Sequence, residues 1–202
     1  MKADFRTDPI RPSTLLRSSR RLDWRFLLPD FRLRRVAYVG LPDAALYDAL
    51  ERVADGVEAI DGAPAPGGTR RYDLVVCREP TRDELATAVA LVELGGTLYA
   101  EIERPLADRL RHWRNPARAE LDLVRRRLSA ECFWHWPDFE DCEEIVPLAD
   151  SGAIRLMLAR RWTYGGRAKA VLAGALVTLG LFGPVPSCVS VVARSGGQIE
   201  GR

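Results

Sequence analysis

Apolar runs typical of buried strands recur along the first half of the chain. They cover residues 36–40, 72–79 and 96–102, and a shorter run at 56–62 contains Asp61 near its end. Continuous apolar runs of this length are typical of parallel strands that are covered on both faces. The pattern therefore predicts four strands in this half of the chain.

Helical periodicity fills two of the gaps between these runs. The first predicted helix follows the run at 36–40 and places one apolar face on Leu46, Tyr47, Leu50, Val53 and Ala54. The second is predicted to begin at Thr81, which forms a capping box with Glu84, and to end at Gly95 and Gly96. Strands and helices that alternate in this way predict βαβ units, and hence an α/β fold with a doubly wound, mostly parallel sheet.

The second half of the chain is predicted to add one long helical segment, two strand-like pieces around Pro137, a pair of helices and a last strand. Their ranges are 105–128, 130–148, 151–162, 166–182 and 187–194. The apolar stretch at 170–193 is long enough to span a bilayer, but Pro184 and Pro186 divide it into a helix and a strand. That division favours a buried core over a membrane span.

The length of 202 residues is that of one domain with decorated ends. We predict a basic lead-in at 1–33, a single α/β domain at 34–194 and a flexible tail at 195–202. Residues 1–35 hold ten Lys or Arg and four Asp, so this arm could touch nucleic acid, an anionic lipid or an acidic protein, or remain solvated. The net charge of +2 argues neither for nor against an anionic partner, and we do not expect nucleic acid to be the partner.

Cysteine usage points to a reducing compartment. Cys77, Cys132, Cys142 and Cys188 lie far apart, with no CxxC pair and no secretory segment at the start of the chain. Cys132 and His135 would point to opposite faces of a strand, so we expect no metal site. The sequence therefore predicts a cytoplasmic protein without a disulfide framework.

Three features together resemble the class I S-adenosylmethionine-dependent methyltransferases. They are a first strand that ends at Gly40, a second that ends at Asp61, and the segments "YDLVVCRE" and "GGTLYAEI". The resemblance covers residues 34–194 and implies a Rossmann-like sheet with a C-terminal antiparallel strand. It also implies S-adenosylmethionine as cofactor and methyl transfer as activity, to an acceptor that the sequence does not identify.

Carried over residue by residue, the resemblance implies a set of cofactor-binding positions. The cofactor would lie against Gly40 and Leu41, and Asp61, followed by Gly62, would accept hydrogen bonds from the ribose hydroxyls. The segment formed by Cys77, Arg78 and Glu79 would flank the adenine or the methionine end. In an open parallel sheet these positions share the carboxyl edge of the strands, where ligands bind.

The chain departs from the family at the first turn and after the second strand. Pro42 and Asp43 replace the usual glycine-rich run; they begin a helix well but bring a carboxylate toward the methionine carboxylate. The Pro/Gly linker at 62–71 leaves out one strand and one helix. These departures favour an alternative, a catalytically inactive methyltransferase-like module that binds or positions a partner protein, with Leu41, Pro42 or Trp24 filling the cofactor's place.

Other candidate chemistry lies near Pro137. His135 stands between two tryptophans and is a candidate general base, or a packed histidine. The segment "WHWPDFEDCEEIVPL" resembles part of methyltransferase-like proteins of cell-surface polysaccharide pathways, so a glycan-type or other small-molecule substrate is one expectation. Its acidic residues are interpreted as a solvated loop. No Walker A, GxSxG or HExxH motif occurs.

Overall fold

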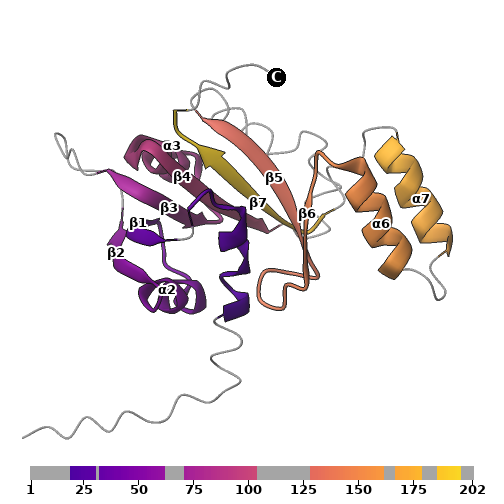
Figure 1. Cartoon of the computed structure of the whole chain (residues 1–202), viewed down its shortest axis with the longest axis horizontal. Coiled ribbons are helices and arrows are strands. Elements are labelled where there is room, and N and C mark those ends of the chain that lie inside the picture. The colour runs from indigo at the N-terminus through magenta and orange to yellow at the C-terminus, as the bar shows by residue number, and fades with distance from the viewer. Residues whose placement is uncertain are drawn as a thin grey trace, which may run out of the picture.

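The computed structural model describes residues 19–30, 32–61, 71–103, 128–161, 167–178 and 186–196. Within them the chain forms one sheet of seven strands with helices on both faces and at one end (Figure 1). In chain order the elements are η1 (Asp23–Leu27), β1 (Leu33–Val39), α2 (Ala44–Glu51), β2 (Ala54–Ile60), β3 (Tyr72–Arg78), α3 (Arg82–Leu91), β4 (Val92–Glu103), β5 (Ser129–Trp136), β6 (Glu144–Pro147), α6 (Ser151–Arg161), α7 (Arg167–Thr178) and β7 (Cys188–Arg194).

The strand order confirms the predicted fold class. Across the sheet the order is β2, β1, β3, β4, β7, β5, β6. The first four strands pair in parallel, whereas β7 runs antiparallel between β4 and β5, and β6 runs antiparallel to β5. Five strands therefore point one way and only β6 and β7 the other, as in a doubly wound, mostly parallel sheet with an antiparallel C-terminal strand.

Two cores cover the two faces of the parallel half. Tyr38 of β1 packs with Leu46 of α2 and with Trp24 of η1, whereas its neighbour Val39 packs with Leu85 of α3 on the opposite face. Successive side chains of a strand point to opposite faces, so β1 contributes to both cores. The doubly covered strand is the reason that residues 36–39 are apolar without alternation.

The helix after β1 is shorter than its apolar pattern predicts. α2 ends at Glu51, and Ala54 is the first residue of β2 and not part of the helical face. Val53 stands in the connecting turn with its side chain 40% exposed, and its N–H donates to the Leu50 carbonyl at 3.0 Å. The prediction was wrong here because the first apolar residues of a strand can continue the spacing of a preceding helix.

The prediction that Gly95 and Gly96 end the second helix is wrong, because both lie inside β4. α3 ends at Leu91 and β4 begins at once with Val92, which pairs with Tyr72. The pairing of β3 with β4 shifts register after Tyr72, and a Cβ on Gly96 would fall 2.9 Å from the Tyr72 carbonyl oxygen. The two glycines thus permit a bulge and a close approach of two strands.

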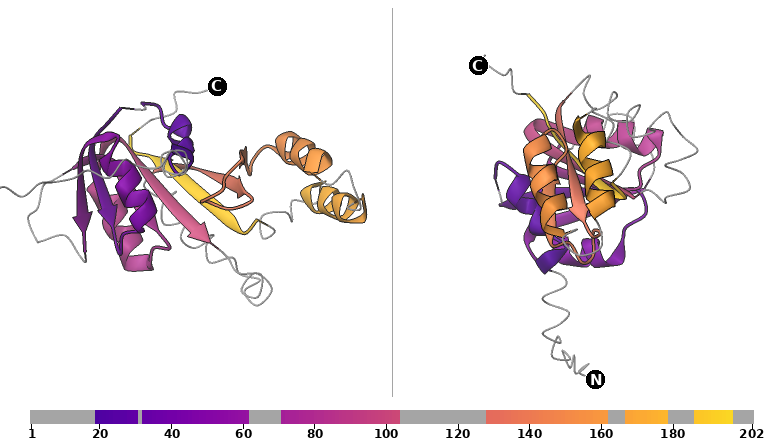
Figure 2. Two further views of the ribbon diagram at one scale, coloured as in Figure 1. Left: turned by 90° about the horizontal axis from the view of Figure 1, so that it is seen from below. Right: turned by 90° about the vertical axis from the view of Figure 1, so that its right-hand side faces the viewer.

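The helices α6 and α7 form a separate layer beyond β6, as both views in Figure 2 show. This layer has its own small core. Its buried members are Trp134, Val146, Ile154, Met157, Leu158 and Val177. Among the described helices none is long and apolar enough to cross a membrane. The predicted helical segment at 105–128 lies outside the described residues except for Leu128, and the predicted tail at 195–202 lies outside them from residue 197.

Candidate functional site

The carboxyl ends of β1 and β3 mark the point where the strand order reverses. From β1 the chain moves to β2 on one side and then returns to β3 on the other. In open α/β folds, ligands bind at the carboxyl edge of the sheet beside such a reversal, and we refer to this edge, at the ends of β1 and β3, as the crevice. Gly40, Asp61 and Glu79 are the residues that follow β1, β2 and β3 directly, so three of the predicted site residues reach this edge.

Gly40 has a backbone conformation that favours glycine. Its φ is +88°, and its N–H donates to the Ile60 carbonyl at 3.0 Å, one residue before Asp61. A Cβ on Gly40 would fall 2.7 Å from Glu84 Oε1. The Glu84 carboxylate is held there by the Thr81 N–H at 2.7 Å and the Thr81 hydroxyl at 2.8 Å. The turn after β1 is therefore fixed by both the positive φ and the capping box of α3.

Asp43 begins α2 and also carries a charge to the crevice. Its carboxylate accepts from the Leu46 N–H at 2.9 Å, as predicted for an N-cap, and pairs with the Arg78 guanidinium from the end of β3. Burial alone would lower the pKa of Arg78, but the charge of Asp43 raises it overall. The Asp43–Arg78 ion pair thus joins the start of α2 to the end of β3. Leu41 is 91% exposed, so its side chain stands in solvent.

The other residues predicted from β2 and β3 differ in how far they reach the crevice. Asp61 is exposed, and Gly62 lies outside the described residues. The Cys77 side chain is buried in the core beneath α3, with Sγ 3.9 Å from the Tyr99 carbonyl, so only its backbone lies along the edge. Glu79 has a φ of +48°, an uncommon value for a residue with a side chain.

Glu79 is held in this conformation by β4. Its N–H donates to the Glu101 carbonyl at 2.8 Å, and its carboxylate accepts from the Glu103 N–H. Burial raises the pKa of Glu79, and the neighbouring charge of Glu103 adds to the rise. The edge therefore presents the carboxylates of Asp43, Asp61 and Glu79. Their charge is balanced in part by Arg78, which also donates to Glu103 at 3.3 Å.

A buried ion pair lies directly behind this edge, and the sequence did not reveal it. Arg21, 2% exposed, donates from Nη1 and Nη2 to the two carboxylate oxygens of Glu101 at 2.5 and 2.6 Å. Glu101 is fully buried and also accepts from the Tyr99 hydroxyl at 3.0 Å. Burial alone would lower the pKa of Arg21, but Glu101 raises it. Arg21 Nη2 also lies 3.9 Å from Asp43 Oδ1, which joins this pair to the crevice.

The segment around η1 is bound to the sheet by more than this ion pair. Trp24 is 2% exposed and stacks on the Tyr99 ring with 3.7 Å between centroids. Its indole N–H donates to the Arg21 carbonyl at 3.0 Å. The Arg21 guanidinium also lies over the Phe139 ring at 5.7 Å. Trp24 thus packs on the face of β4, and it reaches the crevice only through Arg21.

His135 lies in the core of the antiparallel half, with 2% of its surface exposed. Nε2 is 2.7 Å from the Ser190 hydroxyl, and Nδ1 is 3.6 Å from Cys142 Sγ. Burial, and the positive charge of Arg21, lower the pKa of His135 to about 3, while burial raises the pKa of Cys142 to about 11. Both groups are neutral at pH 7. Among the described residues no cluster of His, Cys, Asp or Glu could hold a metal ion.

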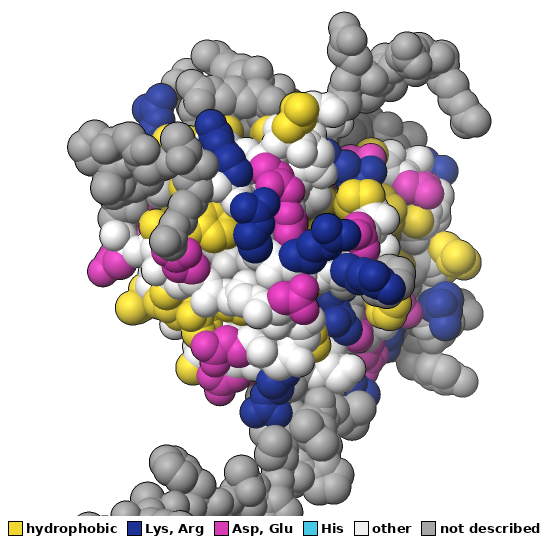
Figure 3. Space-filling model, turned by 60° about the vertical axis from the view of Figure 1, so that its left-hand side comes forward, with side chains coloured by type: hydrophobic (Ala, Val, Ile, Leu, Met, Phe, Trp, Pro, Cys, Tyr) yellow, Lys and Arg dark blue, Asp and Glu magenta, His cyan; other side chains and the backbone are white. Residues whose placement is uncertain are grey.

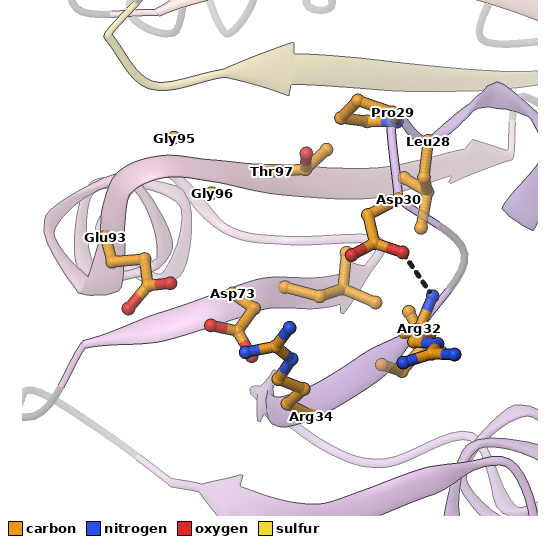
Figure 4. Close-up of a pocket in the computed structure, with 12 residues that line it drawn as sticks. Leu28, Pro29, Asp30, Arg32, Arg34, Asp73, Glu93, Gly95, Gly96 and Thr97 are labelled. Carbon is orange, nitrogen blue, oxygen red and sulfur yellow. Dashed lines mark hydrogen bonds between the residues drawn. The ribbon is translucent and has the colours of Figure 1, made fainter.

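A cavity of about 210 Å3 opens at the opposite edge of the sheet, where β1, β3 and β4 begin (Figure 4). Asp73 and Glu93 stand on its wall, and Arg35 joins them at 3.6 and 2.5 Å. A hydrogen bond with Asp73 raises the pKa of Glu93. Burial alone would raise the pKa of Asp73, but its hydrogen bonds lower it overall. This cavity is distant from the switch point and contains none of the predicted site residues.

Comparison with known proteins finds similarity to solved structures and not to any family or curated sequence. No family model matches the chain, and no curated protein matches its sequence. Similar solved structures include the N-methyltransferase NodS from Bradyrhizobium japonicum, with a TM-score of 0.49 and 12% identity over 93% of this chain and 99% of that one. Another is an S-adenosylmethionine-dependent methyltransferase from Thermotoga maritima, with a TM-score of 0.44 and 12% identity over 89% of each chain. With TM-scores below 0.5, these similarities carry no argument about the fold or the activity of this chain.

Proposed function

We propose that the chain binds S-adenosylmethionine at the carboxyl ends of β1, β2 and β3 and transfers its methyl group to a small-molecule or glycan-type acceptor. One observation carries the proposal. Gly40, with its φ of +88°, lies beside the exposed Asp61 at the point where the strand order reverses. We place the reaction in the cytoplasm. All four cysteines lie among the described residues and none is in a disulfide, which suits a reducing compartment.

The charges at the edge fit those of the cofactor. The exposed Asp61 carboxylate can accept hydrogen bonds from two ribose hydroxyls at once. The amino-acid end of S-adenosylmethionine carries an ammonium and a carboxylate. Glu84 stands against Gly40 and offers a partner for the ammonium. Arg78 pairs with Asp43, which offsets the repulsion that Asp43 alone would exert on the cofactor's carboxylate.

The protein's part in this chemistry is positioning. The bound cofactor supplies a methyl group on a positively charged sulfur, and transfer requires an acceptor held in line with that bond. A fixed turn at Gly40 and a rigid edge at Glu79 would hold donor and acceptor in one geometry, which lowers the entropic part of the barrier. No step requires His135, whose two ring nitrogens both have partners in the core.

Isothermal titration calorimetry with S-adenosylmethionine and S-adenosylhomocysteine tests the proposal directly. We expect both to bind, and we expect the D61N variant to bind roughly tenfold or more weakly, because a hydrogen bond to a charged group contributes roughly 1.5–3 kcal/mol. D55N is the matched control, since Asp55 is an exposed acid near the start of β2, the strand that Asp61 follows. Equal affinities of D61N and D55N would contradict the assignment of Asp61.

A second candidate is a non-catalytic module that binds or positions a partner protein. It is favoured by the ion pairs at the edge, because Arg21 and Arg78 already pair with Glu101, Asp43 and Glu103. Calorimetry separates the two candidates. Absence of heat with either cofactor form at millimolar concentration, from a chain shown to be folded, would exclude methyl transfer and leave the binding module.

A further inference from the structure

The layer of α6 and α7 turns one face of each helix away from the rest of the molecule. The two helices lie side by side at the end of the sheet, with β6 behind them (Figure 2). On α6, Ile154, Met157 and Leu158 are buried, so the opposite face of the helix is directed outward. On α7, Val177 is buried, and the residues half a turn away are exposed. We refer to these two exposed helix faces as the outer face of the layer.

The outer face carries aliphatic side chains in solvent. Leu156 of α6 is 62% exposed and Val171 of α7 is 73% exposed. Ala159 and Ala175 are exposed on the same two helices. The other large exposed aliphatic side chains among the described residues, Leu41, Val53 and Leu94, lie in three separate segments, whereas Leu156 and Val171 share one layer.

The charge of the layer is of one sign. No acidic residue occurs in residues 151–199, whereas the two helices contain Arg155, Arg160, Arg161, Arg167 and Lys169. Arg161 turns toward Glu143 and Glu144, at 2.5 and 3.3 Å. Arg160 lies 3.8 Å from Glu144 Oε1 but keeps 69% of its side chain in solvent, and Arg155 is exposed and donates to the Thr178 hydroxyl at 3.1 Å. By contrast, basic and acidic side chains are intermixed on the face shown in Figure 3.

We propose that the outer face of α6 and α7 docks on an anionic lipid surface. Helices that lie in the plane of a membrane combine exposed aliphatic residues, which enter the headgroup boundary, with basic residues that meet anionic lipids. The two helices have both features and contain no acidic residue of their own. Glu143 and Glu144 offset part of the charge of Arg160 and Arg161, and the remaining positive charge of the helices complements a phosphatidylserine-rich leaflet. The crevice at the ends of β1 and β3 lies elsewhere on the sheet, so docking does not depend on the proposed methyl transfer.

Co-sedimentation of the full chain with phosphatidylcholine vesicles, with and without phosphatidylserine, tests this proposal. We expect binding only to the anionic vesicles. R155Q/R160Q should weaken it roughly thirtyfold, because each Lys or Arg near an anionic membrane contributes about 1 kcal/mol. Its matched control, R52Q/R82Q, removes two exposed arginines, one directly after α2 and one at the start of α3, and should bind as the unaltered chain does.

A second pair of variants tests the exposed aliphatic side chains of the outer face. L156E should also weaken binding, whereas L94E makes the same change at an 85% exposed leucine near the start of β4 and should not. The basic arm is tested with R17S/R20S. If that variant alone loses binding, if the control pairs weaken it as much as the α6 variants, or if no anionic vesicle binds, the proposal is overturned. Circular dichroism verifies that each variant is folded.

Discussion

Removing the charge of Glu101 should destabilise the fold far more than removing the charge of an exposed acid at the same distance from its arginine. Arg21 and Glu101 form a bidentate pair at 2.5 and 2.6 Å, and their side chains are 2% and 0% exposed. E101Q would leave Arg21 as a buried cation without its hydrogen-bonded carboxylate, with Asp43 Oδ1 still 3.9 Å from Nη2. Breaking a buried pair in this way costs about 3–5 kcal/mol, a large part of the stability of one domain.

The chain provides a matched control in the pair of Arg35 and Glu93. Its closest nitrogen-to-oxygen distance is also 2.5 Å, but the side chains are 60% and 29% exposed. E93Q should cost less than about 1 kcal/mol, because exposed ion pairs are screened by solvent and contribute little. In E101Q, the Gln side chain preserves the shape of Glu101 and can still accept from the Tyr99 hydroxyl. The comparison of E101Q with E93Q therefore isolates the effect of the charge.

Urea unfolding at constant pH, followed by tryptophan fluorescence, measures both changes, and the slope with denaturant shows whether the transition remains comparable. A double variant, R21M/E101Q, provides the internal check. It should lose less stability than the sum of R21M and E101Q, because neither charge then remains alone in the core. An E101Q variant within about 1 kcal/mol of the unaltered chain would refute the reasoning, as would strict additivity of the two single changes.

Two further predictions concern His135 and Gly40. Burial lowers the pKa of His135 from 6.5 to about 3, so the unfolded chain binds a proton that the folded chain does not, and stability should fall with acid between these values. From pH 6.5 to 5 the loss should exceed that of H135Q by about 2 kcal/mol, and equal pH slopes in urea unfolding would contradict it. G40A should cost about 1–3 kcal/mol, since its φ is +88° and its Cβ would meet Glu84. G56A, with open space around its Cβ, should be near neutral, and similar thermal shifts of both variants would contradict the role of Gly40.

Local patterns in the sequence were sufficient for the elements that depend on local chemistry. Thr81 and Glu84 identified the start of α3 because a capping box is complete within four residues. Asp43 identified the start of α2 in the same way. The end of that helix was harder to predict, because the apolar spacing continues into Ala54 although the chain has already turned at Val53. A helix that ends without a glycine has no local sequence signal for its C-terminus.

Contacts between distant parts of the chain explain what the sequence did not reveal at the site. Arg78 stands 35 residues from Asp43, and nothing in either neighbourhood indicates that they pair across the crevice. Gly95 and Gly96 follow a helical pattern, yet the pairing of β3 with β4 determines their place inside a strand. The positions of Gly40 and Asp61 at one edge could be predicted, because strand ends in a parallel sheet share that edge.

One residue did carry a signal for the buried network. Glu101 lies between Ala100 and Ile102 in a strand covered on both faces, where a charge is stable only with a partner. β4 contains no Lys or Arg, so the partner had to come from another segment, and the N-terminal segment is rich in arginine. That segment supplies Arg21, 80 residues away, which closes the core beside the crevice. The charge in β4 therefore explains why part of the basic arm is packed as core, and it ties the geometry of the proposed cofactor site to residues that precede β1.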